Sequence, residues 1–111
     1  MRKLYIVKET KQFEDIINTG YCVKNKYFVV HEKENNLPYD RFGISVSKKL
    51  GNAVFRNRYK RVLRSILDNY KKLYINNKDY IIILRKDAIN QDYELLKNEL
   101  FNLINHNKKG I

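Results

Sequence analysis

The sequence contains few of the residues that mark disulfide-rich or membrane proteins. Among its 111 residues are one cysteine, one proline, four glycines and no tryptophan. The single Cys22 excludes an internal disulfide framework and fits a reducing, cytoplasmic setting, and we expect it to be a small buried side chain on a strand. The longest apolar run, Tyr80 to Leu84, is far too short to span a bilayer. The basic start of the chain also lacks the apolar segment of a signal peptide.

Repeats, low-complexity tracts and Pro/Gly-rich linkers are also missing, so nothing divides the chain into parts. An apolar content of 43% is enough for one modest core, to which nine tyrosines and five phenylalanines contribute much of the volume. We therefore expect a single domain over residues 1–111, with flexible termini at about 1–8 and 106–111.

Acidic side chains are scarce: twelve Asp and Glu stand against 23 Lys and Arg, which gives a formal net charge of +11. Such an excess indicates a polyanionic partner, either a nucleic acid or an anionic membrane surface. The window from Arg41 to Arg64 holds eight basic residues and no acid, whereas the rest of the chain holds fifteen basic and twelve acidic residues, a net of +3. Most of the excess therefore lies in one short segment, which indicates a binding site.

The order of the predicted elements indicates the fold class. We expect a helix over 10–20, strands over 21–33, 42–47 and 79–85, a long helix over 52–73, and a last helix that begins after 88–92. Asn25 is placed to interrupt the first of these strands, and the apolar run of the last strand is typical of burial on both faces. Helices covering a small sheet make an α+β (α/β sandwich) fold.

Three residues are predicted to mark helix ends. Thr10 can cap the first helix, on which Phe13, Ile16 and Ile17 share one face, and Gly20 is placed to end it as a C′ residue. Asn52 is a good N-cap for the long helix.

The long helix divides into two faces on a helical wheel. The apolar residues share a sector of about 100° and form a stripe that we expect to face the core: Phe55, Tyr59, Val62, Leu63, Ile66, Tyr70 and Leu73. Basic and amide residues occupy the remaining circumference, with Asn57, Lys60, Arg61 and Arg64 on one ridge.

The placement of charge on this helix favours phosphate binding over a merely solvated face. Arg56, Lys60 and Arg64 are spaced four residues apart, so like charges are neighbours and no acid relieves their repulsion. Arg56 and Arg58 lie near the helix N-terminus, where the dipole disfavours cations unless an anion binds. Arginine also suits bidentate phosphate contacts and stacking on bases.

The same segment resembles a family motif. SVSKK at Ser45–Lys49, GNAV at Gly51–Val54, and RNR at Arg56–Arg58, followed by further basic residues, are similar to the motif of the bacterial ribonuclease P protein subunit. The resemblance extends along the chain, through the first helix that ends in Gly20 to the Asp-Tyr-apolar strand at Asp79–Leu84. It implies the order α-β-β-β-α-β-α, a ribosomal protein S5 domain 2-like fold, and a left-handed crossover through the Arg-rich helix, against the usual rule.

The resemblance further implies that the chain is not itself the catalyst. In this family a large RNA carries the active site and the Mg²⁺ ions, and removes the 5′ leader of precursor tRNA, while the protein binds that RNA and the single-stranded leader. No cofactor is then bound firmly by the protein. The residues expected to dock on the catalytic RNA are Lys48, Lys49, Asn52, Arg56, Asn57, Arg58, Lys60, Arg61 and Arg64. The residues expected to line a leader cleft between the first helix and the sheet are Phe13, Ile17, Tyr27, Val29, His31 and Ser45.

Some of these cleft assignments stay open at the sequence level. Phe13 fits a core position on an amphipathic helix as well as it fits a base-stacking position. Alternation alone does not tell which sheet face Tyr27, Val29 and Ser45 occupy. Ile17 and His31 stand where the family often has aromatic residues, although a histidine ring can still stack.

The remaining residues give no catalytic pattern. The acids Asp68, Asp79, Asp87 and Asp92 lack the paired spacing of a two-metal nuclease. His31 and His106 lie far apart in the sequence, and no Cys/His metal spacing occurs. We therefore expect neither a catalytic residue nor a metal ligand in this chain.

Three other classes of protein fit this sequence less well. A structural RNA-binding protein such as a ribosomal component shares the composition, but the RNR-bearing motif favours ribonuclease P. A peripheral membrane protein would leave the apolar stripe of the basic helix exposed. A helix-turn-helix DNA binder would need a partner helix directly before Asn52, where FGISVS indicates a strand instead.

Overall fold

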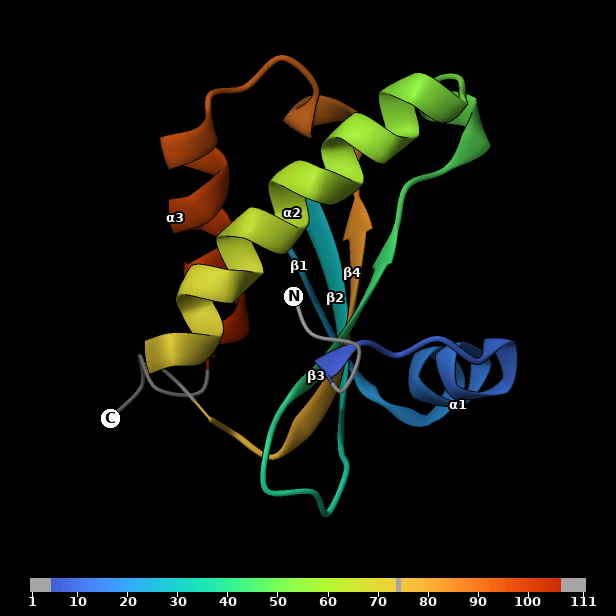
Figure 1. The fold of residues 1–111 in the computed structure, drawn as a ribbon, viewed down its shortest axis with the longest axis vertical. Coiled ribbons are helices and arrows are strands. Elements are labelled where there is room, and N and C mark those ends of the chain that lie inside the picture. Colours follow the sequence, from blue (N-terminus) through green and yellow to red (C-terminus); the bar gives the residue numbers. More distant parts are fainter. Residues whose placement is uncertain (1–4, 74, 107–111) are drawn as a thin grey trace.

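The computed structural model describes residues 5–73 and 75–106 (Figure 1). Three helices and four strands follow one another as α1 (Thr10–Thr19), β1 (Tyr21–Lys24), β2 (Phe28–Glu34), β3 (Arg41–Ser45), α2 (Ala53–Leu73), β4 (Lys78–Leu84) and α3 (Tyr93–Ile104). Two short 3₁₀ turns, η2 (Lys48–Leu50) and η3 (Lys86–Ala88), precede α2 and α3. The predicted order α-β-β-β-α-β-α and the α+β class are confirmed.

The four strands form one mixed sheet in the order β1-β2-β4-β3. The pairs β1–β2 and β2–β4 are antiparallel, and β3–β4 is parallel. Helices α2 and α3 cover one face and α1 covers the other (Figure 1). The connection from β3 through α2 to β4 joins neighbouring parallel strands and is left-handed, as the family resemblance implies.

The larger core lies between the sheet and the pair α2 and α3. Leu63, Ile66 and Tyr70 of the predicted apolar stripe are fully buried there. The rings of Phe42 and Tyr80 stack beneath them with centroids 5.3 Å apart. This burial removes the free apolar face that a membrane-surface helix would need.

The predicted stripe was too narrow on one side. Leu67 is also fully buried, about 40° further round the helix than Leu63. Phe55, Tyr59 and Val62 are only half-buried, and the side chain of Leu73 lies outside the described residues. A helix that rests on a sheet and also meets a neighbouring helix buries a wider sector than one contact requires, which accounts for Leu67.

The smaller core lies on the opposite face, under α1, where Val7, Ile16 and Ile81 are buried together. The N–H of Val7 donates to the carbonyl oxygen of Phe42 at 2.9 Å, and Ile6 forms a parallel bridge with Phe42. Residues 6 and 7 of the N-terminal segment that was expected to be flexible thus pair with β3, and residues 1–4 lie outside the described residues.

The first residue of the C-terminal segment that was expected to be flexible, His106, contacts the sheet. His106 stacks on Tyr21, with ring centroids 5.4 Å apart, and its Nε2 lies 2.8 Å from Glu32 Oε1. The remaining residues of that predicted segment, 107–111, lie outside the described residues. His106 is thus tied to β1 and β2.

Two of the predicted helix ends need correction. Helix α1 begins at Thr10 with Glu9 as its N-cap, and no side chain caps it, so Thr10 is not the cap. Gly20 follows α1 but is extended, with φ −81°, and does not adopt the left-handed conformation of a C′ glycine. Asn25 acts as predicted: its Oδ1 accepts the N–H groups of Tyr27 and Phe28 and turns the chain between β1 and β2.

Candidate RNA-binding surface

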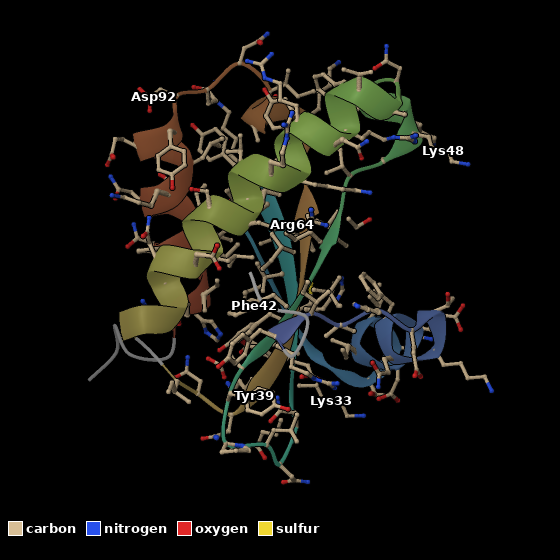
Figure 2. The ribbon with its side chains drawn as sticks, viewed as in Figure 1. Lys33, Tyr39, Phe42, Lys48, Arg64 and Asp92 are labelled. Atoms are coloured by element: carbon tan, nitrogen blue, oxygen red, sulfur yellow. The ribbon has the colours of Figure 1, made fainter. Side chains whose placement is uncertain are left out.

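The start of α2 is fixed by two side-chain caps. Asn52 Oδ1 accepts the N–H of Phe55 at 3.0 Å, which confirms the predicted cap, and Ser47 Oγ accepts the N–H of Lys49 at 3.2 Å. Strand β3 and the short turn η2 come directly before α2, so the partner helix of a helix-turn-helix motif is absent from residues 41–52. Lys48, Lys49 and Asn52 are exposed around this entrance. Figure 2 shows Lys48 just before the start of α2.

The basic residues of α2 fall into three rows along the helix. The first row, Arg56, Lys60 and Arg64, has a spacing of four residues and lies on the same side of the helix as Leu67. The second row, Asn57 and Arg61, points away from the core. Arg58 lies on the side of the helix opposite the first row. Arg58, Arg61 and Arg64 are exposed, while Arg56 and Lys60 are half-buried. Within the described part of the chain, none of these arginines or Lys60 is paired with a carboxylate. Three sides of α2 therefore offer unpaired cations.

Arg41 belongs to the basic window by sequence, but the structure separates it from the other seven cations. Its Nε and Nη2 donate to the two carboxylate oxygens of Asp79 at 2.8 and 2.5 Å, and Asn35 donates to the same carboxylate. The hydrogen bond to Asp79 raises the pKa of Arg41. Arg41 is thus part of a partly buried ion pair and not of the exposed basic surface.

We expect Arg41→Gln to lower the free energy of unfolding by about 2 kcal/mol, because it leaves the Asp79 carboxylate in a mostly buried site without its charged partner. Thermal and urea unfolding measure this loss. Arg61→Gln is the matched control: Arg61 is exposed and makes no ion pair within residues 5–73 and 75–106, so this variant should unfold like the wild type. A loss of RNA affinity with unchanged stability in Arg41→Gln would contradict this assignment.

The strand registers place most of the expected cleft residues on the α1 face. His31, Ile81 and Gly43 form one row across β2, β4 and β3, and Val29, Ile83 and Ser45 form the next. The α1 side of the first row is covered by Phe13: a Cβ on Gly43 would lie 2.6 Å from Phe13 Cζ. Val29, Ile83 and Ser45 remain half-buried beside it, and Ile17 is 38% exposed on α1.

Tyr27 is the exception among the expected cleft residues. It packs against the core under α2 and α3, because the turn at Asn25 precedes it and strand alternation begins only at Phe28. Cys22 also differs from expectation: it is exposed on edge strand β1. Ile83 was missed at the sequence level, because a continuous apolar run does not show which of its residues is half-exposed.

His31 is half-buried, and burial lowers the pKa of its imidazole, which favours the neutral ring. Its Nδ1 is buried and has no hydrogen-bond partner among the residues that the structure describes. A neutral ring in this position can pack flat against an uncharged base without the cost of desolvating a cation.

The structure brings the two predicted surfaces together at the edge of β3. Phe13, assigned to the leader cleft, and Lys60 and Arg64, assigned to docking, line one small pocket there. The basic face of α2 and the aromatic residue of α1 therefore form one continuous surface around this edge strand.

Comparison with known proteins decides the family. The model of the ribonuclease P family matches residues 1–108. The chain is 39% identical over 108 residues to the ribonuclease P protein component of Lactococcus lactis, covering 97% of this chain and 92% of that protein. This chain belongs to the ribonuclease P protein family.

Solved structures of ribonuclease P proteins share the fold. A Staphylococcus aureus ribonuclease P protein mutant with defective mRNA degradation activity is 37% identical and has a TM-score of 0.86, covering 96% of this chain and 90% of its own. The ribonuclease P protein from Thermotoga maritima is 32% identical with a TM-score of 0.82, covering 87% and 92%. Members of this family are subunits of an endoribonuclease complex that processes tRNA.

Two further observations concern this ribonuclease P protein over residues 5–73 and 75–106. No helix there is long and apolar enough to cross a membrane. Nor do three or more His, Cys, Asp or Glu side chains gather where they could hold a metal ion. Two of the acids already have structural partners: Asp79 accepts hydrogen bonds from Arg41, and Asp92 caps α3 by accepting the N–H of Leu95.

Proposed function

We propose that this chain docks on the catalytic RNA of ribonuclease P through α2 and holds the single-stranded 5′ leader of precursor tRNA on the α1 side of the sheet. The RNA carries out hydrolysis with its own Mg²⁺ ions in the cytoplasm. The protein raises substrate affinity, and the RNA supplies the chemistry. The observation that carries the proposal is the set of exposed arginines on α2, Arg58, Arg61 and Arg64, none of which is paired with a carboxylate within residues 5–73 and 75–106.

The docking role is supported by charge and geometry. Arg58, Arg61 and Arg64 are exposed on a helix whose core contacts are made by Leu63, Ile66 and Tyr70 on another side, so these arginines are not needed for packing. Guanidinium groups bind phosphates in a bidentate way, and the capped N-terminus of α2 adds its dipole. The docking surface includes Lys48, Lys49 and Asn52 at the entrance of the helix.

The leader role is supported by an apolar and aromatic surface beside the basic helix. Phe13, Val29 and His31 lie on the α1 side of the sheet, and each is only half-buried, so part of its surface is open to a ligand. Unpaired bases stack on aromatic side chains, and each stack contributes about 1–3 kcal/mol. The adjoining cations hold the backbone that carries those bases.

Reconstitution tests the proposal. Protein freed of RNA is expected to leave precursor tRNA intact, and the same protein should enhance cleavage by its cognate RNA at low Mg²⁺. Denatured protein and a basic protein of equal charge serve as controls for nonspecific screening of RNA phosphates. Cleavage by the RNA-free protein, or no enhancement of the cognate RNA, would contradict the subunit role.

We expect Phe13→Ala to reduce, by about tenfold, the affinity advantage that a leader-bearing precursor has over mature tRNA, because one stacking surface is lost. Equilibrium binding of both substrates to the holoenzyme measures this ratio. Because Phe13 also packs on the small core, the melting temperature and the affinity for mature tRNA are measured alongside. A fall in the affinities for both substrates by the same factor would mean that Phe13 serves the core only.

A further inference from the structure

Val54 is an apolar side chain on the outer side of a basic helix. It is 78% exposed, the largest exposed fraction among the large hydrophobic residues that the structure describes. It lies in the first turn of α2, and in Figure 1 this helix lies in front of the sheet, so that its outer side faces the viewer. A single exposed valine is ordinary on a protein surface, so its neighbours on the helix decide whether it has a role.

The neighbours of Val54 on the helix surface belong to the docking surface. Asn57, Arg58 and Arg61 follow it at spacings of three, four and seven residues, which place all four residues on one outward strip of α2. The Cβ atoms of residues three or four apart on a helix are separated by about 5–6 Å. An RNA that contacts Asn57 and Arg58 together therefore also covers Val54 and removes its surface from water.

Cations lie on both sides of Val54 and Asn57. Arg58 lies on one side and Arg64 on the other, about 120° apart around the helix axis, and both are exposed. Neither is paired with a carboxylate within residues 5–73 and 75–106. The first three turns of α2 thus present an aliphatic side chain and an amide between two guanidinium groups.

This arrangement matches the minor groove of an RNA double helix. That groove is wide and shallow, and it displays base edges and ribose 2′-hydroxyl groups between two phosphate strands. An amide can hydrogen-bond to a base edge or a 2′-hydroxyl group, and guanidinium groups bind phosphates. Unpaired bases instead need flat rings to stack on, and Tyr59 and Tyr70 of α2 pack against the core. The outward strip therefore fits helical RNA better than a single strand.

We propose that α2 lies along the minor groove of a double-helical segment of the catalytic RNA. Val54 and Asn57 face the floor of the groove. Arg58 and Arg64 bind phosphates of its two strands. The inference rests on the proposed docking function and deepens it, because it specifies the form of RNA that α2 binds and adds Val54 to the docking residues.

The contact of Val54 differs in kind from that of an arginine. Burial of an apolar side chain adds affinity without releasing counterions, whereas each phosphate contact adds to the salt dependence. The groove also discriminates between nucleic acids. The minor groove of B-form DNA is about 6 Å wide, too narrow for a helix with a diameter of about 10–12 Å, whereas that of RNA is wide.

The test compares Val54→Thr with Arg58→Gln in binding to the catalytic RNA over a range of salt concentrations. Threonine is β-branched like valine and has a similar helix propensity, but a hydroxyl group replaces one methyl group. We expect Val54→Thr to weaken binding about five- to tenfold with an unchanged slope of log affinity against log salt. Arg58→Gln should weaken binding and also lower the slope by about one.

Ile75→Thr is the matched control for the loss of an exposed apolar side chain. Ile75 is 62% exposed but lies between α2 and β4, so its variant should keep the wild-type affinity and slope. Melting curves check that every variant is folded. Wild-type affinity in Val54→Thr would overturn the apolar contact, and so would an equal loss of affinity in Ile75→Thr.

Competition and footprinting test the form of the RNA. A short RNA duplex should displace the catalytic RNA from the wild-type protein at lower concentration than a DNA duplex of the same sequence. A hydroxyl-radical footprint of the complex should show protected riboses on both strands of one helix, opposite one another across its minor groove. Equal competition by the DNA duplex, or protection confined to an unpaired segment, would overturn the assignment of the groove.

The outcomes separate this inference from the function on which it rests. If Arg58→Gln changes neither affinity nor slope, α2 does not bind the phosphates and the proposed docking function is wrong. If Arg58→Gln behaves as expected but Val54→Thr binds like the wild type, the docking function stands and only the groove contact is wrong.

Discussion

Replacing Arg56, Arg58 and Arg61 together by glutamine is expected to weaken binding to the catalytic RNA about 100- to 1000-fold. Each guanidinium that contacts a phosphate contributes about 1–1.5 kcal/mol, and the three contacts lie on different sides of α2, so their losses nearly add. Stability should hold or rise slightly, because none of the three is paired with a carboxylate in the part of the chain that the structure describes. Filter binding and thermal melts measure the two quantities.

The salt dependence separates phosphate contacts from general attraction. Loss of three contacts should lower the slope of log affinity against log salt by about two to three. The control replaces Lys8, Lys11 and Lys97, which lie outside α2, by glutamine and so removes the same charge. We expect its slope to stay near that of the wild type. If both triple variants lose the same affinity and slope, net charge alone drives binding and α2 is not the docking surface.

Local signals in the sequence predicted the elements well. Asn52 and Asn25 each bond backbone N–H groups within three residues, so their roles need no knowledge of the rest of the fold. The apolar stripe of α2 follows from helical periodicity in the same way, and three of its residues are fully buried as expected. The topology itself, with its left-handed crossover, came from the family resemblance and not from periodicity.

Features that depend on contacts between residues distant in the sequence could not be predicted from the sequence alone. Arg41 is opposite Asp79 in the parallel β3–β4 register, 38 residues away, so only the pairing of the strands removes it from the basic surface. Leu67 is buried because α2 contacts more than one element, and Tyr27 turns away because of the bend at Asn25. The meeting of Phe13 with Lys60 and Arg64 likewise requires the fold.

Gly20 shows how a correct prediction of a boundary rested on the wrong cause. The sequence predicts a left-handed glycine that ends α1, but Gly20 is extended. Its small size matters instead: a Cβ there would lie 2.4 Å from the carbonyl oxygen of Ile16 and 2.6 Å from that of Glu32. One oxygen belongs to the backbone of α1 and the other to the backbone of β2. A Cβ at this position would therefore push α1 away from the sheet.

We therefore expect Gly20→Ala to lower the free energy of unfolding by about 3 kcal/mol and the melting temperature by about 10 °C. Gly20→Asn distinguishes the two causes, because asparagine tolerates a left-handed cap but also carries a Cβ; it should be at least as unstable as the alanine variant. In the control Gly51→Ala, the three atoms nearest to the new Cβ all belong to the side chain of Phe55, at 2.5 to 3.0 Å. This half-buried side chain can turn about its Cα–Cβ bond more easily than backbone can move, so about 1 kcal/mol is expected. A Gly20→Asn variant as stable as the wild type would favour the left-handed cap as the explanation and would contradict the close backbone approach.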